Sequence, residues 1–277
     1  MTPSVQIVLV LYGHTLAESR AFNSFMRYRH LLSAHTFLLI YNNSPEIKVE
    51  PAHDGSYDIF NSTQNDMLAK AYNMALEYAG KNGCGWLMPL DQDTELNSKF
   101  FSELDIALSN VTDSVAAILP IFMKDGVRLS PVFYHPALSS HWCRKPVSPG
   151  LSHACISAFN SCATIAIKAI KAIGGFPEEY PLDDLDMCYL YRFYRLGYTF
   201  LIIDAGLNQD LSILDYKKHM TTERYNMILD ADLRFAREIG MTAVIMWKLR
   251  MVLRCLKSLS NTDRRKYIPL TLSYIFK

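Results

Sequence analysis

Two kinds of apolar segment alternate along the first half of the chain, and this alternation is the strongest constraint on its fold. Residues 5–12 form a run rich in Val, Ile and Leu that is typical of a strand buried on both faces. Residues 16–32 then place apolar side chains at helical spacing, and residues 36–41 are apolar again. The alternation continues with a weak strand near 57–60, a helix over 65–79 and a strand over 86–90. Strands separated by helices of this length pair in parallel through right-handed crossovers, so we expect an α/β sheet.

The second half of the chain is less regular. An apolar strand over 114–121 precedes residues 127–151, whose four prolines and several aromatic residues predict a long irregular loop that is functional or mobile. We expect a helix over 163–173 that stops at a Gly-Gly pair, a helix over 185–196 and a final strand over 198–204. From residue 225 onward the pattern is helical and basic. We therefore divide the chain into an α/β domain, residues 1–215, and a helical, amphipathic extension, residues 216–277.

Composition excludes several classes of protein. With 277 residues, half of them hydrophobic, the chain can bury a substantial core, and a net charge of +1 argues against nucleic-acid binding. Six cysteines show neither a zinc pattern nor the density of a disulfide framework, which favours a reducing compartment. The chain starts without the basic segment of a secretory signal, and no apolar run is long enough to cross a bilayer. We expect a cytoplasmic protein.

Two acidic clusters each follow a predicted strand or turn. Residues 91–93 are Asp-Gln-Asp after the strand over 86–90, and residues 183–186 are Asp-Asp-Leu-Asp shortly after a Gly-Gly-Phe turn. Carboxylates held close together repel one another unless a cation lies between them, so the clusters indicate a divalent metal and a diphosphate ligand. Open parallel sheets bind ligands beyond the carboxyl ends of their strands, where residues 12–14, 42–43 and 91–93 would gather.

Six short motifs occur in a fixed order along the chain. They are Val-Leu-Tyr-Gly at 10–13, Asn-Asn-Ser at 42–44, Asn65 with Asn73, Leu-Asp-Gln-Asp-Thr at 90–94, Gly-Gly-Phe at 174–176, and the acidic run at 183–186. Together they resemble family 2 glycosyltransferases of the GT-A fold. The form at 90–94 is especially similar to bacterial rhamnosyltransferase-like members that build surface polysaccharides such as O-antigen. The resemblance covers roughly residues 5–215. It implies a Rossmann-like, mostly parallel sheet flanked by helices.

The resemblance also implies the ligands and the residues that bind them. The donor would be a UDP- or dTDP-linked sugar, and the acceptor a polyprenyl-diphosphate-linked glycan. The residues expected around the nucleotide are Leu11, Tyr12, Asn43, Asn65, Asn73, Asp91 and Gln92. Asp91 would contact ribose or sugar, and Asp93 would bind Mg²⁺ or Mn²⁺ that bridges the diphosphate, with Asp91 and Gln209 as further metal ligands. The metal would offset charge on the leaving group.

The acidic run at 183–186 would supply the catalytic base. Asp183 and Asp184 match the acidic pair before a helix in this family, and Asp184 would deprotonate the acceptor hydroxyl for direct displacement with inversion. Asp186 is the close competitor for that role.

Three positions depart from the family pattern. Asp66 and Cys162 stand where Gly is common, and Gln209 stands in a segment that often carries a metal-binding His. A single amide oxygen is a poorer ligand than an imidazole, so metal dependence stays open.

Structural interpretations stay open for the same residues. Asp93 or Thr94 could simply cap a helix that starts near Asn97, and the run at 183–186 could be a solvated helix start, where acids suit the helix dipole. Asn73 could pack or cap locally.

Other functions also stay open. A catalytically inactive, sugar-nucleotide-binding paralogue would fit Gln209. A nucleotidyltransferase also uses acidic metal ligands but normally has a Gly-rich, basic phosphate loop, whereas Gly13 stands alone. The chain has no Gly-x-Gly-x-x-Gly turn, which disfavours a dinucleotide oxidoreductase.

The C-terminal extension mixes basic and apolar residues. Its basic residues Lys248, Arg250, Arg254 and Lys257 are interleaved with Trp247, Leu249, Leu253 and Leu256. A helix of this kind fits an anionic membrane surface and suggests peripheral attachment at the inner face of the cytoplasmic membrane. The alternative is a helix packed on the catalytic domain or on a second subunit.

Overall fold

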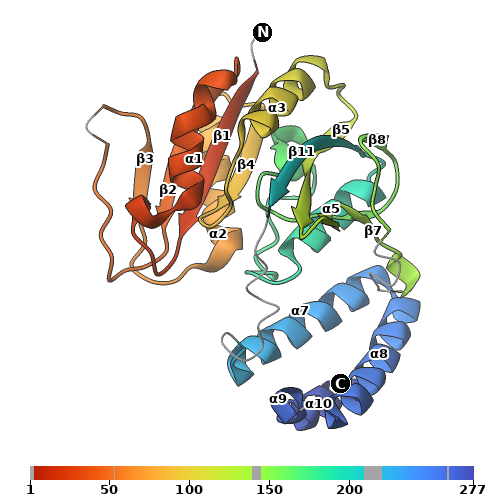
Figure 1. The fold of residues 1–277 in the computed structure, drawn as a ribbon. Coiled ribbons are helices and arrows are strands. Elements are labelled where there is room, and N and C mark those ends of the chain that lie inside the picture. Colours follow the sequence, from red (N-terminus) through yellow and green to blue (C-terminus); the bar gives the residue numbers. More distant parts are fainter. Residues whose placement is uncertain (1–2, 53, 139–144, 209–219, 261) are drawn as a thin grey trace. The chain divides into compact units, whose positions relative to one another are not determined.

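The computed structural model describes residues 3–52, 54–138, 145–208, 220–260 and 262–277 (Figure 1). The chain forms two compact units. The first unit takes Met1–Phe133 and Lys145–Gln209, and the second takes Tyr134–Arg144 and Asp210–Lys277. A segment from the middle of the chain therefore belongs to the second unit, together with the C-terminal helices.

One mixed sheet forms the centre of the first unit. In the described residues nine strands join it, in the order β3-β2-β1-β4-β10-β5-β11-β8, with β6 paired to β5. The parallel half consists of β1 (Ser4–Leu11), β2 (His35–Asn42), β3 (Asp58–Asn61) and β4 (Trp86–Asp91). The other half consists of β5 (Val115–Lys124), β6 (Val127–Ser130), β8 (Gly150–Ser152), β10 (Thr164–Ala166) and β11 (Thr199–Asn208). The mixed α/β architecture predicted from the sequence is confirmed.

Helices pack on both faces of the sheet in the first unit (Figure 1). They are α1 (Arg20–Tyr28), α2 (Met67–Lys81), α3 (Ser98–Asn110), α4 (Ile167–Ala172) and α5 (Leu185–Arg195). Alternate residues of β1, such as Ile7 and Leu9, join a core with Phe25 of α1 and Phe100 of α3. The intervening Val8 is equally buried, because a central strand in a covered sheet has no solvent face.

Several element boundaries differ from the sequence prediction. The helix expected over 163–173 is divided, since Thr164 and Ile165 pair as a strand between β4 and β5 before α4 begins. The helix expected over 16–32 is shortened to α1, which lies between the single turns Leu16–Glu18 and Arg29–Leu31. The stretch at 127–151, expected to be irregular, includes β6, β8 and β7 (Val132–Phe133), which pairs with β9 (Ile156–Ser157).

The second unit is helical. It contains a short turn at Pro136–Leu138 and the helices α7 (Thr222–Ile239), α8 (Met241–Leu259), α9 (Thr262–Arg265) and α10 (Ile268–Ile275). Thr221 caps α7 by accepting a hydrogen bond from the Arg224 N–H at 3.1 Å. Leu229 and Leu233 of α7 and Trp247 of α8 share one core. Within the described residues, none of the helices combines the length and apolarity that a membrane span requires.

Candidate functional site

The carboxyl ends of β1, β2 and β4 lie side by side. The pairing register sets Leu11 opposite Asn42 and Val10 opposite Asp91. Because these strands are parallel, the residues that follow them start from the same edge of the sheet. This edge brings together Tyr12, Asn43 and the acidic segment at 91–93, which are 31 to 81 residues apart in the chain.

Gln92 fastens the end of β4 to the end of β1. The Tyr12 N–H donates to Gln92 Oε1 at 2.8 Å, and Gln92 Nε2 donates to the Tyr12 carbonyl at 3.0 Å. The Gln92 carbonyl in turn accepts from Ser19 Oγ at 3.0 Å and from the Ala21 N–H at 3.2 Å. Because its side-chain amide makes these hydrogen bonds, Gln92 has a structural role and holds the ends of β1 and β4 together. The Tyr12 side chain is 58% exposed, so its ring is available to a ligand at this edge.

Asn43 joins the end of β2 to the start of α2. Its Oδ1 accepts from the Asp66 N–H at 2.7 Å and its Nδ2 donates to the Met67 carbonyl at 3.2 Å. Asn65 supports the same turn, since its Oδ1 accepts from the Met67 N–H at 3.0 Å. Leu11 is fully buried, and its carbonyl accepts from the Asn43 N–H at 2.8 Å. Leu11 and Asn43 therefore shape the wall of the site from within.

Asp66 is an internal anchor of this wall. Its carboxylate accepts from Lys70 Nζ at 2.6 Å, Ser62 Oγ at 2.5 Å and Tyr41 Oη at 2.7 Å. Burial opposes ionisation of this carboxyl, but the hydrogen bonds from Lys70, Ser62 and Gln64 outweigh it and lower the pKa of Asp66. Asp66 thus holds the loop before α2.

Two carboxylates from distant parts of the chain influence each other inside the site. Burial, together with the negative charges of Asp93 and Asp186, raises the pKa of Asp91 to about 7. Burial and the charge of Asp183 raise the pKa of Asp186 to about 6, against a hydrogen bond from the Met187 N–H at 2.8 Å. The structure therefore brings the strand-end acid and the helix-start acid together, where a cation would relieve their repulsion.

A loop from residues 160–162 holds the turn that contains Asp91. Ser161 Oγ accepts from the Asp91 N–H at 3.1 Å and lies 2.7 Å from Thr94 Oγ1 in a second hydrogen bond. The Cys162 N–H donates to the Pro89 carbonyl at 2.8 Å. Cys162 has φ 63°, in the left-handed region where Gly is common, so the loop keeps this shape with a larger residue.

The capping alternative for Asp93 and Thr94 is wrong. The cap of α3 is Asn97, whose Oδ1 accepts from the Phe100 N–H at 2.8 Å. Thr94 is buried against Ser161, whereas Asp93 is exposed. The Asp93 carboxylate therefore lies at the surface of the site, beside the partly buried Asp91.

Asn73 positions the turn that precedes the second acidic cluster. Its Oδ1 accepts from the Phe176 N–H at 2.8 Å, and its Nδ2 donates to the Phe176 carbonyl at 2.9 Å and to Glu178 Oε1 at 3.2 Å. Gly175 has φ 101°, and a Cβ at this position would lie 3.0 Å from Asn73 Oδ1. The Asn73 amide is occupied by these contacts, as the local-packing interpretation expected.

Asp184 is the residue from which α5 starts. Its backbone is left-handed, with φ 56°, and its carbonyl accepts from the Cys188 N–H at 2.8 Å. A non-glycine residue in this conformation is strained by about 1–2 kcal/mol. Such strain concentrates at functional sites. Asp183 and Asp184 are partly buried at the start of α5, and Asp186 lies in its first turn.

Two tyrosines that the sequence analysis did not consider complete the cluster. Tyr72 of α2 and Tyr189 of α5 flank Phe176, with ring centroids 5.2 and 5.6 Å from it. Both hydroxyls are buried and have no hydrogen-bond partner in the described part of the chain. Burial raises the pKa of each phenol, and the charges of Asp91 and Asp186 raise it further. Tyr189 could have been predicted from the sequence as a site residue, because it lies one helical turn after Asp186.

The carboxylates of the site fit a divalent cation. No group of three or more His, Cys, Asp or Glu side chains in the described ranges could hold a metal by itself, and Gln209 lies outside these ranges. Asp91 and Asp93 still offer the hard oxygen ligands that Mg²⁺ and Mn²⁺ prefer, and Mg²⁺ commonly uses one or two carboxylates together with substrate phosphates. Burial and the negative charges of Asp93 and Asp186, which together raise the pKa of Asp91, favour a cation here.

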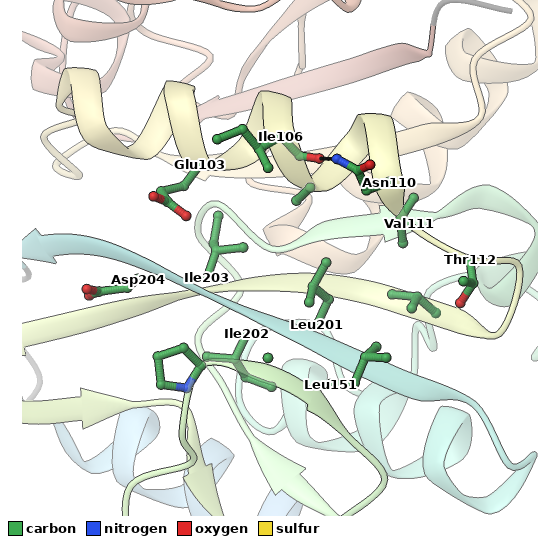
Figure 2. Close-up of a pocket in the computed structure, with 14 residues that line it drawn as sticks. Glu103, Ile106, Asn110, Val111, Thr112, Leu151, Leu201, Ile202, Ile203 and Asp204 are labelled. Atoms are coloured by element: carbon green, nitrogen blue, oxygen red, sulfur yellow. Dashed lines mark hydrogen bonds between the residues drawn. The ribbon is translucent and has the colours of Figure 1, made fainter.

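A cavity of about 400 Å³ lies elsewhere in the first unit, between α3, β11 and β8 (Figure 2). Aliphatic side chains such as Leu201 and Ile203 line most of it, and Glu103 and Asp204 lie toward one end. Lys99 Nζ pairs with Asp204 at 2.9 Å. An apolar cavity with acids at one end is unsuited to a diphosphate, so the acidic edge of the sheet is the better candidate site.

Comparison with solved structures shows that the chain has the fold of nucleotide-sugar glycosyltransferases. It matches the mannosyltransferase PcManGT from Pyrobaculum calidifontis, in complex with GDP-Man and Mn²⁺, with a TM-score of 0.52 and 10% identity over 100% of this chain and 86% of that one. It matches S. aureus TarS 1–349 in complex with UDP-GlcNAc with a TM-score of 0.60 and 8% identity over 98% and 79%. No protein-family model and no curated protein sequence matches the chain. At these identities the likeness establishes the GT-A fold and not the reaction.

Proposed function

We propose that the protein is a glycosyltransferase that moves a sugar from a nucleoside-diphosphate sugar to a glycan acceptor. The observation that carries this proposal is the meeting of Asp91 and Asp186 at the carboxyl edge of the sheet, next to the exposed Asp93. Such an edge suits a metal-diphosphate group. The likeness in fold to structures that hold GDP-Man or UDP-GlcNAc supports the same choice of ligand.

The strand ends would bind the donor. The exposed Tyr12 ring would contact the nucleobase. Leu11 and Asn43, at strand ends held in place by hydrogen bonds, would set the depth of the nucleotide pocket. Asp91 would accept a hydrogen bond from a ribose or sugar hydroxyl. Asp93, with Asp91, would hold Mg²⁺ or Mn²⁺, which when bound offsets charge on the diphosphate leaving group.

The start of α5 would supply the base. The Asp184 carboxylate takes the proton from the acceptor hydroxyl, the oxygen forms a bond to the anomeric carbon, and the nucleoside diphosphate leaves from the opposite face. The configuration at the anomeric carbon of the transferred sugar is therefore inverted. Asp186 is the alternative base, since a pKa raised to about 6 lies nearer to neutrality and suits proton transfer.

The finer assignment rests on the resemblance in the Leu-Asp-Gln-Asp-Thr motif at 90–94. It makes the chain a family 2, rhamnosyltransferase-like enzyme that uses a UDP- or dTDP-sugar. Its acceptor is a growing surface polysaccharide, such as O-antigen, carried on polyprenyl diphosphate at the inner face of the cytoplasmic membrane. Residues 1–215 would carry out the transfer, and residues 216–277 would contact the membrane.

A donor screen tests the proposal. Purified protein with Mg²⁺ or Mn²⁺ should release nucleoside diphosphate from one donor in a panel of nucleotide sugars, and Asp93→Ala should lower this release by about 10³-fold or more, as loss of leaving-group stabilisation does. Asp58→Ala, at an exposed acid on β3, is the matched control and should stay active. Binding of a donor without any release would favour the inactive paralogue. Normal turnover by folded Asp93→Ala would refute the metal role.

A further inference from the structure

Helix α8 has two apolar faces; among the described residues, one is packed and the other is exposed. The inner face places Ala243, Trp247, Met251 and Cys255 against the core of the second unit. On the opposite face, large apolar side chains recur every three or four residues and are between 41% and 75% exposed. These are Met241, Ile245, Leu249, Val252, Leu253, Leu256 and Leu259, here called the outer stripe. The sequence analysis grouped Trp247 with the residues of the membrane face, and this is wrong, because Trp247 is 1% exposed.

A basic cavity of about 300 Å³ lies beside the outer stripe. Arg250, Arg254 and Lys257 of α8 line it together with Arg264 of α9, and Leu253 of the stripe also lines it. Helix α8 contributes four basic residues and no acid to this part of the second unit, and Arg250, Arg254 and Arg264 also take part in interactions within the protein. A cluster of guanidinium and ammonium groups suits a phosphate group, which Arg binds with paired hydrogen bonds.

From these two features, we propose that α8 lies in the surface of an anionic membrane. The outer stripe enters the boundary between headgroups and acyl chains, and the basic cavity binds the phosphate of an anionic lipid. A helix with one apolar face and adjacent cations adopts this position in a bilayer. Insertion of the apolar side chains and attraction of the cations to anionic lipids both stabilise the bound state. The inference deepens the membrane location within the proposed function, but it concerns only the second unit and needs no transfer reaction.

Charge decides between a lipid surface and a second copy of the chain. If two copies of α8 met through their outer stripes, the arginine and lysine rows of both helices would come close together. With no acid on α8, this arrangement is repulsive. An anionic lipid surface instead complements both the apolar stripe and the cations beside it. The structure therefore favours the lipid as the occupant.

Vesicle binding by the full-length protein tests the stripe. The protein should sediment with vesicles of phosphatidylcholine and phosphatidylglycerol at low salt, bind pure phosphatidylcholine weakly, and lose binding as salt is added. Leu249→Gln combined with Leu256→Gln should weaken binding about tenfold or more, because two inserted leucines are lost. Ile106→Gln combined with Leu196→Gln removes equally exposed apolar residues from the first unit and should bind like the wild type.

A second pair of variants tests the cavity. Arg254→Gln with Lys257→Gln should weaken binding to phosphatidylglycerol vesicles about thirtyfold and leave binding to phosphatidylcholine unchanged, at roughly one kcal/mol per basic residue. The inference is overturned if the wild type fails to bind anionic vesicles at low salt, or if it binds inorganic phosphate alone and no vesicle. It is also overturned if the stripe variant binds vesicles normally while a wild-type dimer, measured by light scattering, is lost. Nucleoside diphosphate release with a water-soluble acceptor is a separate readout, which reports on the proposed function alone.

Discussion

The carboxyl edge of the sheet withdraws acidic side chains from solvent, whereas the outer stripe of α8 exposes apolar side chains to it. At the sheet edge, the partly buried acids Asp91 and Asp186 lie with the buried phenols of Tyr72 and Tyr189. On α8, leucines and other large apolar residues face outward. Buried charge and exposed apolar surface both cost free energy when the protein is alone. Each region therefore indicates a missing partner, and the two partners have opposite chemistry: a cation with phosphates at the sheet, an apolar layer at the helix.

The two faces of α8 give the largest expected difference in stability. Trp247→Ala should lower the free energy of unfolding by about 3–5 kcal/mol, because it leaves a cavity in the core of the second unit. Leu256→Ala should change it by less than about 0.5 kcal/mol, because the side chain is already exposed. Urea unfolding followed by circular dichroism measures both. Equal losses for the two variants would mean that the outer stripe is packed in solution.

The acidic run at the start of α5 gives the next largest effect. Asp184→Asn keeps the size of the side chain and removes its basicity, so kcat should fall by about 10²-fold or more while donor KM changes little. Steady-state kinetics with the donor found in the screen measure this. If Asp186→Asn shows the loss and Asp184→Asn remains active, the base is two residues further along α5.

Buried charge at the sheet edge predicts a pH-dependent stability. The unfolded Asp91 has an ordinary pKa near 4, and the folded one has a pKa of about 7. Below about pH 4 the Asp91 carboxyl is protonated in both the folded and the unfolded protein, so it does not lower the free energy of unfolding. Between about pH 4 and 7 it ionises only in the unfolded protein, so the free energy of unfolding falls as the pH rises. Above about pH 7 it is ionised in both states, and the free energy of unfolding levels off. Asp91→Asn should reduce the loss between pH 4 and pH 6 by about 2 kcal/mol, measured by urea unfolding without metal. If Asp91→Asn and the wild type show the same pH dependence of the free energy of unfolding, ionisation of Asp91 does not destabilise the folded protein.

Removing a buried hydroxyl should have opposite effects in the two units. Tyr72→Phe removes an unpaired hydroxyl and should raise stability by about 1 kcal/mol in the protein without ligand. Tyr267→Phe removes a hydroxyl that donates to the Met220 carbonyl at 2.6 Å and should lower stability by a similar amount. Thermal unfolding compares the pair. Destabilisation by Tyr72→Phe would indicate a partner for its hydroxyl in solution.

The sequence by itself determined the α/β class and the edge of the sheet where the candidate site lies. Local periodicity carries this information, because a strand buried on both faces needs a continuous apolar run such as residues 5–12, and parallel strands end at one edge. The acidic segment at 91–93 could be placed at that edge from the sequence, since it begins at the last residue of β4. Element ends were less predictable. Thr164 and Ile165 form a strand because they lie between β4 and β5, which no local pattern specifies.

Only the tertiary structure decided which groups share an environment. Asp91 and Asp186 are far apart in the chain, so their mutual repulsion depends on where the sheet and α5 meet. The same packing turns Asn73 toward Phe176 and leaves Tyr72 and Tyr189 without hydrogen-bond partners in the described residues. On α8 the sequence shows apolar residues on both sides of the helix, and packing decides that Trp247 is inside and Leu256 outside. Burial and electrostatics depend on contacts between segments distant in sequence, whereas helix and strand periodicity depend on neighbours along the chain.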